Sequence, residues 1–422
     1  MSVRLPQPVE GASPPAPYHR GVTVYLDHAA SAPLRPAVLE QMLPHLRGEQ
    51  ANPSSPHAPG RRARAALDEA HERLAAAIGA EARAIVFTGG GTEAINLAVK
   101  GAAWAGKAEG HRILTTAIEH KAVLESCLLL EKYGFEVQRL PVDRYGRVDP
   151  DDLTAALTDK TVLVSLQLAN NEVGTIQPID ELVERVRSAS PARVHVDAVQ
   201  AAAWLSLDMA ALDVDLATFA AHKLEGPKGV GALWIRRGMA ILPQIHGGAQ
   251  ERYRRAGTEN VAGAVGMAAA FELTVAERDE VVPAVAARRD RLRDVVLGIE
   301  GVEQTGHPTE RLPNSLSVIV PDVSGDDIVI GLDLEGIACS TGSACTSGSS
   351  EPSHVLSAMG YPPPEARGSL RLSLGRTTTD EDVDAVVHAL PPIVARLRQG
   401  AARLEWAATG RAEASGAGEP EA

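Results

Sequence analysis

The chain has 422 residues, of which 45% are hydrophobic, so it can bury a large core and divide into two or three domains. Its 41 Lys and Arg residues are outnumbered by 54 Asp and Glu residues, and the net charge of −13 argues against a surface that binds nucleic acid. No run is apolar over the thickness of a bilayer, and the start of the chain lacks the hydrophobic core of a signal peptide. We therefore expect a cytoplasmic protein.

Short β-rich runs alternate with helical patterns between residues 84 and 235. Candidate strands are AIVFT (84–88), ILTTAI (113–118), EVQRL (136–140), VLVSLQL (162–168), VHVDA (194–198), LATFA (216–220) and GALWI (231–235). Several of these runs are apolar on both faces, which is typical of parallel strands covered by helices. The alternation predicts an α/β fold with a mainly parallel, seven-stranded sheet.

The pattern changes after about residue 261. Long helical runs such as AVAARRDRLRDVVLGI lead to a strand LSVIV, a polar loop at residues 338–353 and a second strand SLRLSLG. We assign residues 21–262 to a large domain and residues 263–405 to a smaller α+β domain that carries the loop. Residues 1–20 are Pro-rich and residues 406–422 are rich in small residues, and we expect both ends to be disordered.

A triple glycine at residues 89–91 joins a predicted strand to a helix that Thr92 can cap. Such a turn exposes backbone N–H groups and a helix dipole to an anion, which suits one phosphate. Taken alone, a glycine turn that only connects strand to helix is the simpler interpretation. The spacing matches neither the Walker A nor the dinucleotide-binding pattern.

Polar side chains follow four further strands: His120, Asn171, Asp197 and Lys223. Each alone is explained by capping or turn chemistry. Together, at the edge where open α/β sheets bind ligands, they fit a polarised aromatic cofactor. A lysine at the end of a buried strand can form a Schiff base, and Asp197 can hold a pyridinium nitrogen in its protonated state. The pattern predicts a site for pyridoxal 5′-phosphate (PLP).

Two more residues are candidates for chemistry on a substrate. Cys345 lies at the centre of the polar loop, where a thiol has the access that a nucleophile needs, whereas Cys339 follows the apolar GIA and is expected to be packed. Arg371 alternates with leucines on a strand and can clamp an amino-acid carboxylate. For the cysteines, the competing interpretation is a surface loop with incidental thiols. For Arg371, it is a surface salt bridge. The three cysteines are too few for a disulfide framework, and no Cys/His spacing indicates a metal.

From about residue 24 to residue 380 the chain resembles, in order and spacing, the cysteine desulfurases. The similar segments are YLDHAASAP, ANPSSPHAPG, FTGGGTEAINLAVKG, EHKAVLESC, PVDRYGRVDP, VSLQLANNEVGTIQPI, VHVDAVQA, AHKLEGPKGVGAL, HGGAQERYRRAGTENVAGAVG, RLPNSLSVIV, STGSACTSGSSEPSHVLSAMG and SLRLSLGRTTT. The resemblance implies a homodimeric enzyme of the class V aminotransferase fold, a fold-type I PLP-dependent transferase. It would convert L-cysteine to L-alanine and keep the sulfur as a persulfide on Cys345.

The resemblance also implies roles for individual residues. Lys223 would bind the cofactor, Asp197 would face the pyridine nitrogen, and His120 would stack on the ring. Asn171 and Gln200 would contact the ring hydroxyl. The phosphate would be held by Gly91, Thr92 and His222, with Thr258 of the partner subunit. Arg371 would take the substrate carboxylate. The loop resembles the long-loop branch, which implies delivery of sulfur to acceptor proteins for iron-sulfur cluster assembly or tRNA thiolation.

The chain departs from the family pattern just before the lysine. Where the family has Ser-Gly-His-Lys, this sequence has Ala220 and Ala221 before His222, so a hydroxyl that would contact the phosphate is missing. We expect a weaker hold on the cofactor. Glu225 adds a negative charge near the site that the sequence does not explain. Three alternatives stay open: a selenocysteine lyase, another class V lyase or aminotransferase that does not use a cysteine, and a non-catalytic sulfur-relay scaffold.

Overall fold

The computed structural model describes residues 24–48, 51–342 and 352–415, with residues 401–415 given as helix backbone only. Cys345 and the N-terminal extension at residues 1–20 therefore lie outside the described residues. In the part of the chain that is described, no helix combines the length and apolarity needed to cross a membrane. The same residues contain no cluster of three or more His, Cys, Asp or Glu side chains suited to a metal ion.

A seven-stranded sheet forms the centre of the larger domain, and its strand order is β2-β8-β7-β6-β5-β3-β4. The strands are β2 (Ile85–Thr88), β3 (Arg112–Thr116), β4 (Glu136–Leu140), β5 (Thr161–Gln167), β6 (Arg193–Asp197), β7 (Leu216–Ala220) and β8 (Gly231–Ile235). Only β8 runs antiparallel to its neighbours within this sheet. All seven predicted strands and the mainly parallel sheet are confirmed.

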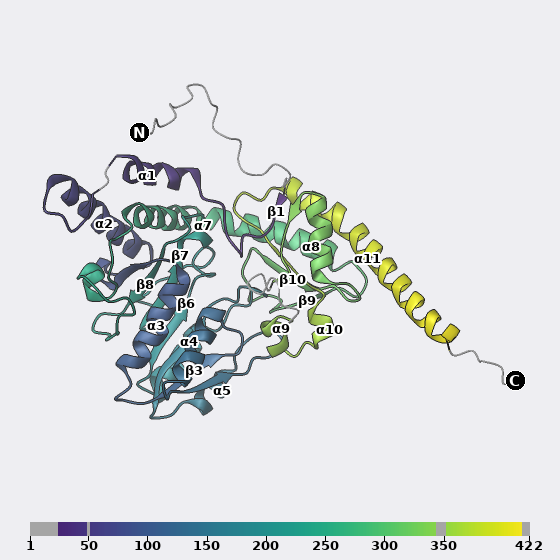
Figure 1. Cartoon of the computed structure of the whole chain (residues 1–422), viewed down its shortest axis with the longest axis horizontal. Coiled ribbons are helices and arrows are strands. Elements are labelled where there is room, and N and C mark those ends of the chain that lie inside the picture. The colour runs from purple at the N-terminus through teal and green to yellow at the C-terminus, as the bar shows by residue number, and fades with distance from the viewer. Residues whose placement is uncertain (1–23, 49–50, 343–351, 416–422) are drawn as a thin grey trace, which may run out of the picture.

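Helices cover both faces of this sheet (Figure 1). On one face, α3 (Gly91–Ala105) and α4 (Lys121–Glu131) pack on alternate strand residues such as Val86 and Ile113. The opposite face, with Ile85 and Leu114, is covered by α2 (Ala58–Ala77), α5 (Pro150–Ala156), α6 (Ile179–Ala189) and the first half of α7 (Val261–Val296). Burial on both sides explains why the strands have no polar face. Helix α1 (Pro36–Arg47) packs on α7.

The smaller domain is built on the antiparallel sheet β12-β10-β9, from β9 (Glu303–Gln304), β10 (Ser315–Ile319) and β12 (Ser369–Ser373). Its helices are α8 (Gly325–Leu334), α9 (His354–Ala358), α10 (Pro363–Ala366) and α11 (Asp380–Ser415). A short parallel pair joins β1 (Val24–Tyr25) to β11 (Ile337–Ala338). Three 3-10 turns complete the described elements: η1 (Ala82–Ala84), η2 (Ala221–Lys223) and η3 (Gln250–Tyr253).

The domain boundaries differ from the expected ones. Val24 and Leu26 belong to the small-domain core, although the large domain was expected to begin at residue 21. Helix α7 crosses the expected boundary at residue 262, since it gives Phe271 to the large core and Leu292 to the small core. A helix of 36 residues is about 54 Å long, which exceeds the width of one small domain.

The expected disordered tail is also corrected in part. Helix α11 continues to Ser415, so residues 406–415 are helical. Four of these ten residues are alanine, the strongest helix former, and this propensity favours the continued helix. Figure 1 shows this end of α11 extending away from the body of the molecule.

Candidate active site

One cavity of about 420 Å³ opens where the strands of the large sheet end and the small domain begins. Nine of the eleven site residues predicted from the sequence line it: Gly91, Thr92, His120, Asn171, Asp197, Gln200, His222, Lys223 and Arg371. Two are not in it. Thr258 is exposed and does not line this cavity, in keeping with its expected role toward a partner subunit, and Cys345 lies outside the described residues.

Asp197 is the last residue of β6 and is 2% exposed. Its Oδ1 accepts a hydrogen bond from Val199 N at 3.0 Å. Burial raises the pKa of this carboxyl, while the positive charges of His120 and Lys223 and a hydrogen bond from Thr218 oppose the rise. The buried carboxylate is thus balanced by groups of the cavity itself.

Lys223 ends the 3-10 turn that follows β7. Its Nζ donates to the carbonyl oxygens of Ala29 and Ala30, at 2.5 and 2.8 Å. The neighbouring His222 places Nδ1 3.3 Å from Ser31 Oγ. Burial first, and then the charges of two lysines, lower the pKa of His222 to about 4, so its imidazole is neutral at neutral pH.

His120 serves two purposes that the sequence offered as alternatives. It is the N-cap of α4, because its Nδ1 accepts from Ala122 N at 3.1 Å. It also lines the cavity. Burial lowers its pKa, and the charge of Asp197 opposes this. Since Nδ1 is an acceptor, the neutral ring carries its proton on Nε2.

The glycine turn places the N-terminus of α3 at the cavity. Gly90, with φ of 148°, is the N-cap and makes no side-chain cap. A Cβ on Gly91 would lie 3.1 Å from Ala220 Cβ and 3.3 Å from Val199 Cγ2, so only glycine fits there without displacement. The expected capping role of Thr92 is wrong, because Thr92 lies inside the first turn and not before it. The helix therefore keeps unpaired N–H groups for an anion.

Arg371, in the middle of β12, is 2% exposed. Its Nη2 donates to Asp27 Oδ1 at 2.8 Å, and its Nη1 donates to the carbonyl oxygens of Asn171 at 2.8 Å and Gly342 at 3.2 Å. The surface salt bridge considered as an alternative is thereby corrected, since this ion pair is buried and faces the cavity. Substrate contact by Arg371 stays a prediction.

Two amides complete the polar wall. Asn171 Oδ1 accepts from Gln167 Nε2 at 3.0 Å, and Gln200 Nε2 donates to Ala29 O at 2.9 Å. Both side chains line the cavity between Asp197 and the small domain. The arrangement combines a lysine, a buried carboxylate, a neutral imidazole, a helix N-terminus and an arginine in one enclosure.

Residues 24–386 match the family Aminotransferase class-V. The chain belongs to this family. The "Cysteine desulfurase IscS" of Methanosarcina thermophila is 48% identical over 375 residues, which cover 89% of this chain and 93% of that protein. The protein of the same name from Dictyoglomus turgidum is 49% identical over 376 residues, covering 89% and 95%.

Solved structures give the same result for this class V aminotransferase family member. A "NIFS-LIKE PROTEIN" superposes with a TM-score of 0.84 at 38% identity, covering 89% of this chain and 100% of that one. "SspA in complex with cysteine" superposes with a TM-score of 0.74 at 32% identity, covering 85% and 100%. The fold and the family expected from the sequence are confirmed.

Several lining residues of this family member were not singled out in the sequence. They are Ala29, Ala30, Lys121, Gln167, Glu172, Ser353 and His354. Glu172 accepts from Ser353 Oγ, and His354 Nε2 lies 3.0 Å from Glu119 O, which ties the start of α9 to the large domain. Lys121 lies in the segment EHK and Glu172 in NNEVG. A single charged residue in a loop carries no local signal that its side chain turns inward.

Glu225, which the sequence left unexplained, faces away from the main cavity. Its Oε2 accepts from Arg376 Nε at 2.9 Å, and its backbone carbonyl accepts from Arg35 N. The residue has a φ of 57° in the turn after Lys223. It therefore connects this turn to the small domain and adds no unbalanced charge to the site.

Proposed function

We propose that the chain is a PLP-dependent cysteine desulfurase that converts L-cysteine to L-alanine and holds the sulfur as a persulfide on Cys345. The observation that carries this proposal is the convergence of Lys223, Asp197, His120 and Arg371 on one cavity. The names of the curated relatives and the cysteine named in the SspA structure support the choice of substrate.

The residues present fit the proposed cofactor. The cavity has room for a substituted pyridine ring, with Lys223 placed for a Schiff base and Asp197 placed for the ring nitrogen. His120 supplies a flat neutral ring, and Asn171 and Gln200 supply amides for the ring hydroxyl. The open N-terminus of α3, with Gly91, Thr92 and His222, would hold the phosphate. When bound, PLP accepts the electrons released at the Cα of an amino acid.

The remaining chemistry belongs to the side chains of the chain. Arg371 binds the substrate carboxylate, and Lys223 moves the proton at Cα. The thiolate of Cys345 attacks the substrate sulfur, so that an S–S bond forms as the Cβ–S bond breaks. The three-carbon fragment takes up protons and leaves as alanine. Thiol exchange then passes the persulfide sulfur to an acceptor.

We also propose a cytoplasmic homodimer in which Thr258 of one subunit reaches the phosphate site of the other. Its exposure at a distance from the cavity of its own chain supports this arrangement. The sulfur acceptors are proposed to be proteins of iron-sulfur cluster assembly or tRNA thiolation. The name IscS of the curated relatives supports the first of these.

Mass analysis after incubation with L-cysteine tests the reaction, the cofactor and the nucleophile together. We expect a mass increase of one sulfur on the peptide that contains Cys345, and its absence in Lys223→Ala. Cys345→Ser should abolish desulfuration and keep the visible absorption of bound PLP. Cys339→Ser is the matched control and should keep activity, since this thiol is largely buried and burial raises its pKa to about 12. Alanine production by Cys345→Ser would overturn the assignment.

A further inference from the structure

The guanidinium of Arg371 is held by a carboxylate from the start of the chain. Asp27 lies just after β1, next to Ser373 of β12 through an isolated bridge. The Asp27 carboxylate is 20% exposed and the Arg371 side chain 3%, so the pair is shielded from solvent on the arginine side. An ion pair in this setting retains much of its electrostatic strength.

Asp27 also opens the segment that contacts Lys223. The Asp27 carbonyl accepts from Ala30 N at 3.0 Å and from Ser31 N at 3.3 Å, which fixes the turn. The carbonyls of Ala29 and Ala30 in this turn are the acceptors of Lys223 Nζ. This short segment therefore contacts both Arg371, through Asp27, and Lys223, through Ala29 and Ala30, and sets their relative position.

The hydrogen bonds of Arg371 leave two of its N–H donors, on Nε and Nη2, without an acceptor among the described residues. A guanidinium carries five N–H donors. Nη1 is used by two backbone carbonyls and Nη2 by Asp27. Nε is buried and has no hydrogen-bond acceptor among the described residues. Arg371 lines the cavity, so a ligand carboxylate there can accept from a guanidinium donor that the protein leaves unused.

We propose that Asp27 is a positioning residue that holds the guanidinium of Arg371 at the cavity and limits its affinity for amino-acid carboxylates. The inference rests on the proposed function, because it takes Arg371 as the carboxylate site. Without the negative charge of Asp27, a correctly oriented guanidinium would offer the arriving carboxylate a full positive charge in a desolvated site. With Asp27, the arriving carboxylate shares the guanidinium with a second carboxylate, which eases release of the alanine product.

Two substitutions separate the charge of Asp27 from its hydrogen bond. Asp27→Asn keeps an oxygen acceptor for Nη2 and removes the negative charge. Asp27→Ala removes both, so the guanidinium loses its orientation. We expect Asp27→Asn to lower the Kd of L-alanine on the order of tenfold. The substitution removes the repulsion between two carboxylates that share one guanidinium, at an effective dielectric constant near 20. Asp27→Ala should raise this Kd.

The experiment is an equilibrium titration of the holoenzyme, followed by calorimetry, with L-alanine and with ethylamine, which is alanine without its carboxylate. In Asp27→Asn the Kd of ethylamine should stay within about twofold of the wild-type value, because no carboxylate is involved. An unchanged or weakened affinity of Asp27→Asn for L-alanine overturns the proposal, as does an equal shift for both ligands. These titrations do not depend on Cys345, so persulfide formation tests the proposed reaction separately.

Discussion

Burial is the largest cause of the pKa shifts of Asp197, His120 and His222 in the cavity, and of Glu119 beside it. Glu119 is fully buried, and burial first and the charge of Asp197 second raise its pKa to about 8. It is therefore neutral at pH 7 and adds no like charge beside Asp197. Its Oε1 accepts from Thr116 Oγ1 and from Gln167 N, both at 2.8 Å.

Glu119→Gln tests this protonation state through the pH dependence of stability. The pKa of Glu119 is raised from 4.5, the ordinary value of a glutamic acid, to about 8, so between these pH values the folded state keeps a proton that the unfolded state has released. This group therefore lowers the free energy of unfolding as the pH rises through that window. In Glu119→Gln the decline should be shallower. Urea unfolding of the wild-type and Glu119→Gln holoenzymes from pH 5 to pH 8.5 measures the free energy of unfolding against pH. Parallel dependences would contradict a protonated Glu119 in the folded state.

Ala220→Ser tests the missing hydroxyl. Ala220 lines the cavity beside the N-terminus of α3. A serine there adds one donor for the phosphate, so PLP should dissociate about fivefold more slowly, as a hydrogen bond to a charged group predicts. Release can be followed by visible absorption in the presence of a PLP-trapping agent. The exposed Ala211→Ser is the control, and an unchanged dissociation rate of Ala220→Ser would contradict the prediction.

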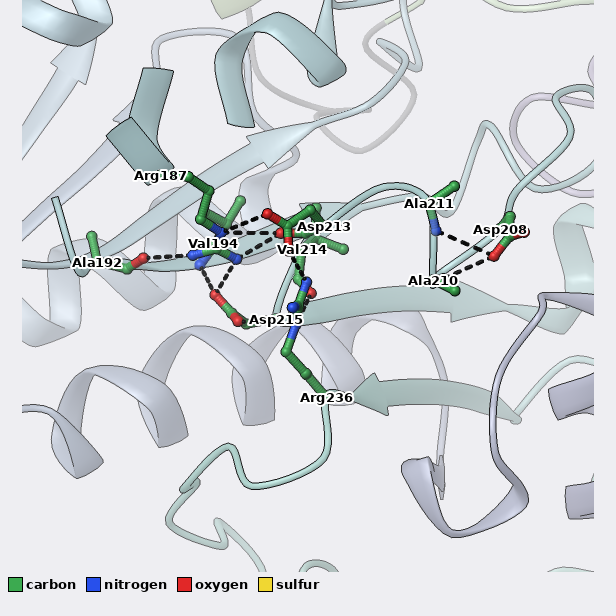
Figure 2. A network of polar contacts seen from close by, with 10 residues as sticks. All are labelled: Arg187, Ala192, Val194, Asp208, Ala210, Ala211, Asp213, Val214, Asp215 and Arg236. Carbon is green, nitrogen blue, oxygen red and sulfur yellow. Dashed lines mark hydrogen bonds and ion pairs between the residues drawn. The ribbon is translucent and has the colours of Figure 1, made fainter. Parts of the chain in front are cut away.

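At the scale of elements, charged residues secure the sheet at the end opposite the cavity. Figure 2 shows Arg187 of α6 and Arg236, just after β8, converging on Asp213 and Asp215 ahead of β7. Asp215 Oδ2 also accepts from Val194 N at 2.7 Å. These contacts fix the starts of β6 and β7, the two strands whose other ends position Asp197 and Lys223.

Asp215→Ala should lower the free energy of unfolding by about 2 kcal/mol. The substitution removes the acceptor of a buried backbone N–H, and two guanidinium groups each lose one carboxylate partner. The matched control is Asp213→Asn. Asp213 is 54% exposed and has a φ of 49°, which asparagine tolerates, so its substitution should cost less than about 1 kcal/mol. Chemical unfolding of both variants measures these changes in the free energy of unfolding. Equal losses would contradict the prediction that Asp215 contributes more than Asp213.

At the scale of the whole molecule, two segments of the chain pass from one domain core toward the other around the site. Helix α7 contributes to both hydrophobic cores. The segment after β1 runs from the small-domain core to Lys223 of the large domain. The cavity lies at this junction, so its geometry depends on both cores.

Leu26→Ala tests the contribution of the segment just after β1 to the whole fold. Leu26 is fully buried in the small-domain core. Its truncation should cost about 3 kcal/mol, the usual range for a leucine cavity. Leu334→Ala is the control, since Leu334 is 79% exposed and should change stability by less than about 0.5 kcal/mol. A loss of similar size in both variants would show that residue 26 does not belong to a packed core.

The sequence by itself determined the seven strands and the mainly parallel sheet, because strand periodicity is a local signal. It also gave nine lining residues of the cavity, some from the polar residues at strand ends and the others from the resemblance to cysteine desulfurases. Only the tertiary structure decided the pairing of Asp27 with Arg371, the inward position of Glu172 and the contact of residues 29–30 with Lys223. These contacts join positions far apart in the chain, so no local pattern encodes them. The domain boundary within α7 was hidden for the same reason: the helix continues across two cores, and the partners that separate these cores lie elsewhere in the chain.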